Sequence, residues 1–339
     1  MSNTKTINAY AALEAGAELK EFSYEVGALA PDEVEIDVLH CGICHSDLSM
    51  IDNEWGMTQY PLVAGHEVIG KISETGSNVD TLKKGMTVGL GWHSGYCGNC
   101  HSCKAGDQNL CSSAKGTIIA HHGGFADKVR ADASSVVVIP DGLNLEAVGP
   151  LLCAGITVFN PLVQFDVKST DKVAVIGIGG LGHIAVQFLN AWGCEVTAFT
   201  SSESKRQEAI ELGAHNTLNS RDSAEIEAAA SSFDFIISTV NVKLDWNLYM
   251  NTLKPKGRLH FVGATLEPLD LGVFSLISGQ RSVSGSPVGS PATIESMLEF
   301  ANLHNIQPQV ETFPMSDINA AFEHMKSGKA RYRIVLSNG

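Results

Sequence analysis

Short apolar runs, separated by glycine-rich turns, dominate roughly the first 145 residues. Runs of this length with turn residues between them are typical of β-strands joined by loops. This part of the chain therefore predicts a mostly antiparallel β domain with long functional loops. The runs that we expect to be strands are 34–40 (VEIDVLH), 66–76 (HEVIGKISETG), 87–92 (TVGLGW) and 135–140 (SVVVIP).

From about residue 150 onward, buried-strand runs alternate with helix-length segments. Residues 181–192 form one such segment, and 202–213 form another that ends in the helix-capping glycine Gly213. Alternation of this kind predicts a parallel, doubly wound sheet with α/β architecture. The runs that we expect to form its strands are 172–180, 194–200, 233–240, 258–264 and 282–290.

The last fifty residues depart from this alternation. Residues 291–306 predict a helix, and 332–336 (YRIVL) predict a strand that returns to the first domain. The apolar face of the predicted helix comprises Ile294, Met297, Leu298 and Ala301. We therefore expect one domain built from 1–150 and 289–339, and a second formed by 151–288.

Composition narrows the class of protein. The chain has 339 residues, of which 44% are hydrophobic and 18% charged, as expected of a soluble enzyme of two domains. Its net charge of −14 argues against partners that are nucleic acids or anionic membranes. The first sixteen residues lack the basic and apolar regions of a secretory signal, and no apolar run is long enough to span a bilayer. We expect a cytoplasmic protein whose eight cysteines are thiols and metal ligands.

The densest group of cysteines has the spacing C-x₂-C-x₂-C-x₇-C. Four thiolates on one loop fill the tetrahedral shell of Zn²⁺ and leave no open position, so this loop predicts a structural zinc site. An iron–sulfur cluster is the alternative, but the bacterial ferredoxin pattern has shorter gaps and a proline after its last cysteine. The four ligands are Cys97, Cys100, Cys103 and Cys111.

The sequence GIGGLG follows an apolar strand and begins a helix. In that context G-x-G-x-x-G is typical of dinucleotide binding. The three glycines permit a tight turn, close approach of the backbone to a pyrophosphate, and tight packing of helix on strand. The helix N-terminus adds amide donors and the positive end of its dipole. The motif comprises Gly177, Gly179 and Gly182, with Gly180 and Leu181 between them.

The next strand run ends without the acid that binds a free ribose 2′-hydroxyl. Hydroxyl groups and two cations follow it instead, and they suit a 2′-phosphate, so NADP(H) is favoured over NAD(H). The acidic side chain of Glu203 counts against NADP(H). The alternative is that the two cations, Lys205 and Arg206, simply belong to a solvated helix face. The residues expected at the phosphate are Thr200, Ser201, Ser202, Lys205 and Arg206.

Four motifs together resemble those of the zinc-containing medium-chain alcohol dehydrogenases. They are 41–47 (CGICHSD), 65–79 (GHEVIGKISETGSNV), the four-cysteine loop and 177–183 (GIGGLGH). More narrowly, the chain resembles the cinnamyl alcohol dehydrogenase branch and bacterial NADPH-dependent broad-range aldehyde reductases. The likeness extends over essentially the whole chain and implies a GroES-like catalytic domain joined to a Rossmann domain.

The resemblance also implies a second, catalytic zinc site. Cys44, His66 and Cys153 would be its ligands, with the fourth position open for water or substrate, as is known for alcohol dehydrogenases. Glu67 would lie behind the metal as an occasional fourth ligand. Asp47 would orient the imidazole of His66. Ligands so far apart in the sequence follow from the resemblance and not from spacing.

Further roles follow from the same resemblance. Ser46 would hydrogen-bond the substrate oxygen and begin the proton path, and Ser49 stands where many relatives carry a histidine that ends it. Around the cofactor, His45 would lie near the pyrophosphate, and Thr157 and Leu181 near the nicotinamide. Trp55 and Trp92 would wall a pocket for apolar or aromatic substrates.

The resemblance therefore implies a zinc-dependent, NADP(H)-linked alcohol dehydrogenase that mainly reduces aldehydes and forms a homodimer or homotetramer. A polyol or sugar dehydrogenase on the same scaffold is the alternative among enzymes. A non-catalytic NADP-binding regulator or a zinc-binding structural protein is the alternative outside them. The two tryptophans favour aldehydes, and an open zinc position has no use in a non-catalytic protein.

Overall fold

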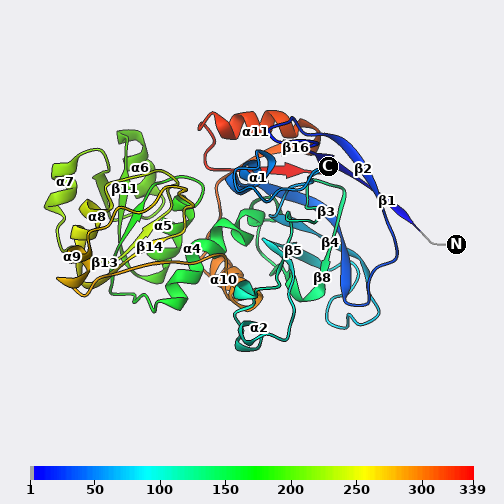
Figure 1. Ribbon diagram of the computed structural model, residues 1–339, viewed down its shortest axis with the longest axis horizontal. Helices are drawn as coiled ribbons and strands as arrows, with labels where there is room; N and C mark the ends of the chain where they lie inside the picture. Colours follow the sequence, from blue (N-terminus) through cyan, green and yellow to red (C-terminus); the bar gives the residue numbers. More distant parts are fainter. Residues whose placement is uncertain (1–3) are drawn as a thin grey trace. The chain divides into compact units, whose positions relative to one another are not determined.

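The computed structural model describes residues 4–339 and separates into two compact units (Figure 1). The first unit comprises the chain up to Ile156 together with Val288–Gly339, and the second comprises Thr157–Pro287. Helix α4 (Ala154–Gln164), with Pro161 inside it, contains the point where the chain leaves the first unit. The first unit is thus built from two separate stretches of sequence.

The first unit is organised around a seven-stranded sheet in the order β16-β17-β3-β4-β5-β9, with β8 also paired to β3. Every pair is antiparallel except β16 with β17. Because β17 pairs with β3, the end of the chain completes a sheet begun near its start, which confirms the expected antiparallel domain and returning strand. The strands are β3 (Glu33–Ile43), β4 (Val68–Thr75), β5 (Thr87–Leu90), β8 (Lys128–Asp132), β9 (Val136–Val138), β16 (Val310–Pro314) and β17 (Arg333–Ser337).

Smaller elements surround this sheet. Strands β1 (Lys5–Ala11) and β2 (Lys20–Val26) form an antiparallel hairpin, and β6 (His93–Gly95) pairs with β7 (Lys115–Gly116). The α-helices of this unit are α1 (His45–Ile51), α2 (His101–Ala105), α3 (Leu145–Val148), α10 (Pro291–Leu303) and α11 (Ile318–Lys326). Short 3₁₀ turns occupy Gln108–Leu110, Ala133–Ser135, Gly149–Leu152 and Met315–Asp317.

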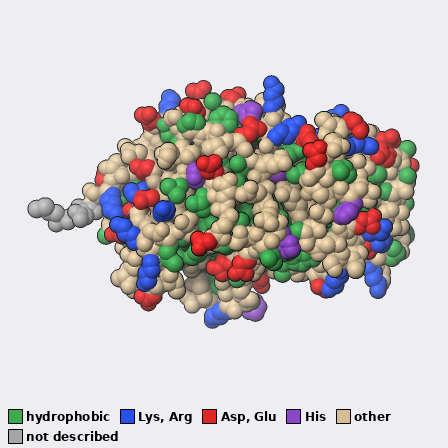
Figure 2. Space-filling model, turned by 180° about the vertical axis from the view of Figure 1, so that it is seen from behind, with side chains coloured by type: hydrophobic (Ala, Val, Ile, Leu, Met, Phe, Trp, Pro, Cys, Tyr) green, Lys and Arg blue, Asp and Glu red, His purple; other side chains and the backbone are tan. Residues whose placement is uncertain are grey.

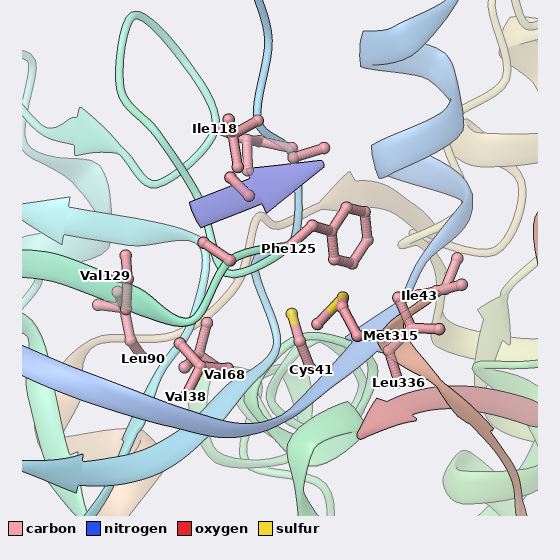
Figure 3. Packing of buried hydrophobic residues seen from close by; sticks show 14 of the residues in the cluster. Val38, Cys41, Ile43, Val68, Leu90, Ile118, Phe125, Val129, Met315 and Leu336 are labelled. Carbon is pink, nitrogen blue, oxygen red and sulfur yellow. The ribbon is translucent and has the colours of Figure 1, made fainter. Parts of the chain in front are cut away.

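The core of the first unit lies against the face of this sheet. Figure 3 shows Phe125 among side chains from β3, β4 and the C-terminal segments, including Cys41, Ile43 and Leu336. Phe125 is fully buried and meets Phe322 of α11 edge to face, with ring centroids 5.9 Å apart. Burial of each large apolar side chain contributes about 1.5–3 kcal/mol. Strand β3, which leads into the candidate site, is therefore packed against a well-buried core.

The second unit is a six-stranded parallel sheet in the order β12-β11-β10-β13-β14-β15. This is the Rossmann order, in which ligands bind beyond the carboxyl ends of the strands where the order reverses, here at β10 and β13. The expected parallel sheet is confirmed. Its strands are β10 (Lys172–Ile176), β11 (Glu195–Thr200), β12 (Asn216–Asn219), β13 (Phe233–Ser238), β14 (Leu253–Phe261) and β15 (Ser282–Gly285).

The helices of the second unit bury an aromatic cluster. Trp246 and Tyr249 of α8 are almost completely buried, and Tyr249 meets Phe199 of β11 edge to face at 5.2 Å. The sequence pattern does not reveal β12, because its residues NTLN are polar and only partly buried. The helices are α5 (Gly182–Trp192), α6 (Glu203–Glu211), α7 (Ser223–Ala228), α8 (Trp246–Thr252) and α9 (Val273–Ile277).

Helix α10 illustrates how local chemistry sets an element. The Ser290 hydroxyl accepts the backbone N–H of Thr293, and Pro291 occupies the first helical position, where no N–H is needed. The four residues predicted for its apolar face are all buried. The sequence therefore predicted this helix and its orientation correctly.

In the part of the chain that the structure describes, no single helix is long and apolar enough to cross a membrane. By length and composition alone, the bent pair 145–152 and 154–164 passes the same criterion when taken together. On the face shown in Figure 2, acidic and basic side chains are interspersed and not gathered by sign.

Candidate active site

The candidate site begins where β3 turns into α1. Cys44 occupies the N-cap position of this helix, and the Asp47 carboxylate accepts its backbone N–H at 2.9 Å. The other oxygen of Asp47 accepts the N–H of Gly65 at 2.9 Å and lies 2.8 Å from His66 Nδ1. A fully buried carboxylate with three such partners fixes the segments that carry Cys44 and His66 relative to each other.

Cys44, His66 and Cys153 converge although they come from distant parts of the chain. Cys44 Sγ lies 3.9 Å from Cys153 Sγ, and His66 Nε2 lies 3.2 Å from the same sulfur. Thiolates about 2.3 Å from a tetrahedral zinc would have their sulfurs about 3.8 Å apart, so this donor set fits zinc. Because Asp47 takes the Nδ1–H of His66, Nε2 is left as the metal-binding nitrogen.

The side chains of this group have strongly shifted pKa values. A hydrogen bond from the Cys153 thiol holds the pKa of the Cys44 thiol well below its usual range. Burial opposes charge on His66, but the Asp47 carboxylate outweighs it and raises the pKa of the imidazole well above its usual value. Cys44 is therefore held as a thiolate, the form of cysteine that binds metals. The pKa of Cys153, by contrast, is raised by its contact with Cys44, and His66 must lose a proton before Nε2 can bind zinc.

Glu67 is the fourth member of the group, and its ligand atoms and those of the other three residues all lie within 4.8 Å of one another. Its Oε1 accepts a hydrogen bond from Arg333 of β17, whereas its Oε2 is buried without a partner. Burial raises the pKa of Glu67, although Arg333 opposes the shift. A side chain on Gly42 would come within 2.0 Å of Oε2, so the adjoining backbone must be glycine. The free oxygen fits an occasional metal contact.

Arg333 is a functional-site residue that the sequence analysis missed. It is 5% exposed and also donates to the Ile43 carbonyl at 3.0 Å. The sequence did contain a signal, because Arg333 directly precedes the apolar run IVL of a predicted strand. A cation buried with such a strand requires a charged or polar partner. It anchors Glu67 behind the candidate metal position.

An aromatic wall adjoins this group. Trp92 meets the His66 ring edge to face, with centroids 5.0 Å apart, and Trp55 meets Trp92 at 6.1 Å. Both tryptophans lie in loops of the first unit. They are the two residues predicted to wall the substrate pocket. Their position beside His66 supplies an apolar surface next to the candidate metal.

Ser46 and Ser49 lie on the same helix as Asp47. Ser46 is partly exposed, whereas Ser49 is 4% exposed and donates a hydrogen bond to Glu54 Oε2 at 2.6 Å. His45 is exposed at the start of α1. Thr157, which the sequence analysis placed near the nicotinamide, belongs to the second unit. Glu54 was not predicted, and nothing in its sequence context marks it.

The four-cysteine loop forms a second, separate group. Cys97 Sγ lies 3.9 Å from Cys103 Sγ and 3.5 Å from Cys111 Sγ, again close to the edges of a tetrahedral zinc site. The amides of Asn99 and Cys100 donate to Cys97 and lower the pKa of its thiol to about 6. The four thiols, completed by Cys100, are therefore arranged to surround one zinc ion and leave no open position.

In the second unit, the glycine-rich loop joins β10 to α5. Gly177 has φ +89°, and a Cβ on Gly182 would lie 1.9 Å from the carbonyl oxygen of Gly177. A Cβ on Gly179 would instead meet nothing within 4 Å. The first and third glycines are thus required by turn and packing, and the middle one leaves open space in which a pyrophosphate can approach the backbone.

The end of β11 carries the residues expected to select the cofactor. Lys205 Nζ lies 3.4 Å from the carbonyl oxygen of Ile178 in the glycine-rich loop. Arg206, by contrast, donates to both oxygens of Glu225 at 3.0 Å and lies 3.6 Å from Glu203. Lys205 is therefore beside the loop, whereas Arg206 is already paired with two acids. Thr200 is buried, and Ser201 and Ser202 are exposed, with Ser202 capping α6.

Comparison with known proteins agrees with this geometry. A family model for the alcohol dehydrogenase GroES-like domain matches residues 30–141, and one for the zinc-binding dehydrogenases matches 180–302. The aldehyde reductase AdhA of Synechocystis sp. is 61% identical over 332 residues, which is 98% of this chain and 99% of that protein. The chain belongs to the zinc-containing alcohol dehydrogenase family.

Solved structures place this alcohol dehydrogenase in the cinnamyl alcohol dehydrogenase branch. The enzyme from Sorghum bicolor has a TM-score of 0.94 and 39% identity, with 98% of each chain covered. A cinnamyl alcohol dehydrogenase of Helicobacter pylori, solved with NADP(H), has a TM-score of 0.91 and 33% identity, with the same coverage. The predicted family is confirmed.

Proposed function

We propose that this alcohol dehydrogenase is a zinc-dependent aldehyde reductase that transfers hydride between NADP(H) and primary alcohols or aldehydes. The observation that carries the proposal is the convergence of Cys44, His66 and Cys153, three ligands that leave a tetrahedral zinc one position for substrate while Glu67 is held by Arg333. The name of the 61% identical relative, aldehyde reductase, supports the direction of reaction. When bound, zinc supplies a Lewis acid for the substrate oxygen, and the nicotinamide supplies or accepts the hydride.

The protein's own residues prepare the reaction. Asp47 holds His66 in the tautomer that leaves Nε2 free, and Arg333 holds Glu67 beside the thiolates. Trp55 and Trp92 supply the apolar surface that would exclude water from the substrate carbonyl. We assign the proton transfer to the substrate oxygen to Ser46, whose partly exposed hydroxyl stands two residues after Cys44 on α1.

The test is an NADPH-oxidation assay over a panel of aliphatic and aromatic aldehydes, with zinc measured on the same preparation. We expect turnover of several aldehydes and two zinc ions per chain, one for each group. A protein that oxidises no NADPH with any aldehyde, or that holds a single zinc, contradicts the proposal. Mannitol belongs in the panel, because a mannitol dehydrogenase of Petroselinum crispum is 41% identical. Faster turnover of mannitol than of any aldehyde would establish the polyol alternative.

We further propose that the residues after β11 select NADP(H). Lys205 beside the glycine-rich loop supports this, because a lysine ammonium in that place can bind a 2′-phosphate. Lys205→Ala should raise the KM for NADPH at least about tenfold more than the KM for NADH, as loss of a charge-assisted contact implies. Arg206→Ala is the matched comparison, and we expect it to have the smaller effect because Arg206 is paired with Glu225. Equal effects on both cofactors would contradict the proposal.

Finally, we propose a homodimer or homotetramer in the cytoplasm. Phe274 is 84% exposed, and other apolar side chains between 266 and 277 are exposed beside it in sequence, as at surfaces that bind another protein. Strand β15 is the edge of its sheet and offers unpaired backbone groups. All eight cysteines are free, which suits a reducing compartment. Sedimentation analysis should show a dimer or tetramer, and a monomer at micromolar concentration would contradict this assembly.

A further inference from the structure

Trp92, which meets the His66 ring, stands in a stretch of chain outside the strands. Strand β5 ends two residues before it and β6 begins directly after it, so Gly91 and Trp92 lie between the large sheet and the β6–β7 pair. A side chain in such a junction is placed only as well as the backbone that carries it. The contacts that hold this backbone therefore decide where the aromatic wall stands.

Thr117 binds both carbonyl groups of this dipeptide. Its backbone N–H donates to the Trp92 carbonyl at 2.9 Å, and its hydroxyl donates to the Gly91 carbonyl at 2.6 Å. Its own carbonyl oxygen lies 3.1 Å from Nδ1 of His121. Because Thr117 is 0% exposed, these hydrogen bonds are shielded from water and hold one geometry.

The dipeptide also packs against the segments that carry candidate zinc ligands. A Cβ on Gly91 would lie 2.7 Å from the carbonyl oxygen of Leu152, the residue before Cys153. Trp92 meets the His66 ring edge to face, with an interplanar angle of 87° and centroids 5.0 Å apart. The backbone of this junction is thus confined beside two of the three ligands of the proposed catalytic zinc.

Resting on the proposed function, we propose that Thr117 is a positioning residue for the substrate pocket: its hydroxyl fixes Trp92 beside His66, and the fixed indole favours aromatic over small aliphatic aldehydes. An aromatic substrate contacts an indole through many atoms, whereas a two-carbon aldehyde reaches few of them. Displacement of the wall therefore weakens binding of the larger substrate more. Thr117 is fully buried and acts through the backbone of the dipeptide.

Bracing of the β6–β7 pair is the competing explanation for these contacts. The bond from the Thr117 N–H to the Trp92 carbonyl continues the ladder of that pair. The bond to the Gly91 carbonyl lies outside the ladder and comes from the side chain alone. Valine has the shape of threonine without its hydroxyl, so Thr117→Val keeps the ladder and removes only the bond to Gly91.

The experiment compares the reduction of benzaldehyde and acetaldehyde by wild type, Thr117→Val and Thr117→Ser. The readout is the ratio of kcat/KM for the two aldehydes, which does not depend on the fraction of active protein. In Thr117→Val we expect this ratio to fall about tenfold through the KM for benzaldehyde, with the kcat for acetaldehyde changed by less than about twofold. Thr117→Ser keeps the hydroxyl and should keep the wild-type ratio within about twofold.

A second variant and a second readout show whether the effect acts through Trp92. In the Trp92→Leu background the wall is absent, so Thr117→Val should change the ratio no further. Tryptophan emission requires no turnover: Thr117→Val should shift the emission spectrum, and the shift should be absent in the Trp92→Leu background. If Thr117→Val does not fold, Thr117→Ala, which also lacks the hydroxyl, takes its place in both measurements.

Thr252→Val is the matched control. Thr252 is likewise 0% exposed, and its hydroxyl donates to the Tyr249 carbonyl at 2.7 Å in the second unit. Both variants remove one buried hydrogen bond and should lower the melting temperature by similar amounts. Only Thr117→Val should change the ratio of the two aldehydes.

Several results would overturn the positioning role. They are an unchanged ratio in Thr117→Val, an equal fall in Thr252→Val, a fall that Thr117→Ser shares in full, or a further fall in the Trp92→Leu background. If the wild-type protein reduces no aldehyde, the proposed function fails and the selection of substrates fails with it. The emission measurement then still decides whether Thr117 holds Trp92.

Discussion

The two cysteine groups of this dehydrogenase are built in opposite ways. The four-cysteine loop collects its thiols within fifteen residues around the five-residue helix α2. The catalytic group joins Cys44 to Cys153 across 109 positions of sequence, and all four of its members are buried. The loop has few apolar side chains to hold it, whereas the catalytic group is fastened by buried protein partners, Asp47 and Arg333.

The comparison indicates that metal has a different task at each site. A short loop without a core depends on its zinc for folding, because binding energy there is folding energy. The catalytic group is held in place by hydrogen bonds within the protein. Its zinc is therefore not needed for folding and can coordinate the substrate. Loss of the loop metal should cost stability, and loss of the catalytic metal should cost activity.

The largest effect is expected from Cys44→Ala. Loss of a ligand at the open site removes Lewis-acid polarisation, worth several kcal/mol, so turnover should fall at least about 10³-fold. Zinc content should drop by one per chain while the melting temperature changes by only a few degrees. Cys41→Ala is the matched control, a fully buried cysteine of β3 outside both groups, and it should keep turnover. Retained activity in Cys44→Ala would contradict the ligand assignment.

Cys103→Ala should reverse this pattern. It removes one thiolate of the closed loop, and we expect the melting temperature to fall by roughly 10 °C, with catalytic zinc retained at low temperature. Calorimetry with zinc analysis checks both quantities. An unchanged melting temperature would show that the loop folds without its metal and would remove the distinction between the two sites.

Asp47→Asn tests whether protein partners preorganise the catalytic group. The amide cannot serve all three of the present partners of the carboxylate and carries no charge beside His66. Zinc affinity at the catalytic site should fall about 10–100-fold in a chelator competition, with the loop zinc unaffected. Asp37→Asn, in the exposed ion pair with Lys128, serves as the control. Equal zinc affinity in Asp47→Asn and wild type would refute the orienting role.

The smallest effect concerns acid stability near the four-cysteine loop. Burial lowers the pKa of His93 in β6 to about 4, so the folded protein keeps this imidazole neutral where the unfolded chain protonates it. The unfolded state therefore binds more protons between pH 6.5 and 4, and stability falls as the pH drops through that window and not above it. At pH 5 the loss should be about 1–2 kcal/mol. His93→Gln should flatten this part of the stability curve; an unaltered slope would exclude His93 as its cause.

Much of the fold was predictable because its signals are local. The cap, the proline and the apolar stripe of helix α10 all lie within one segment. The glycine-rich sequence likewise predicts both a turn and the helix that follows it. The closed zinc loop was predictable for the same reason. Strand β12 was not, since its polar residues are placed by pairing with β11 and not by their own pattern.

The sequence by itself determined most of the elements, the family and the thiols of the loop, because these depend mainly on residues near one another in the chain. Only the tertiary structure decided that Arg333 anchors Glu67 and that Glu54 meets Ser49. It also decided that Lys205, and not Arg206, lies beside the glycine-rich loop. Such contacts depend on the distance between side chains after the sheets have formed. A charge-assisted bond acts over about 3 Å, and no spacing in the sequence encodes that distance.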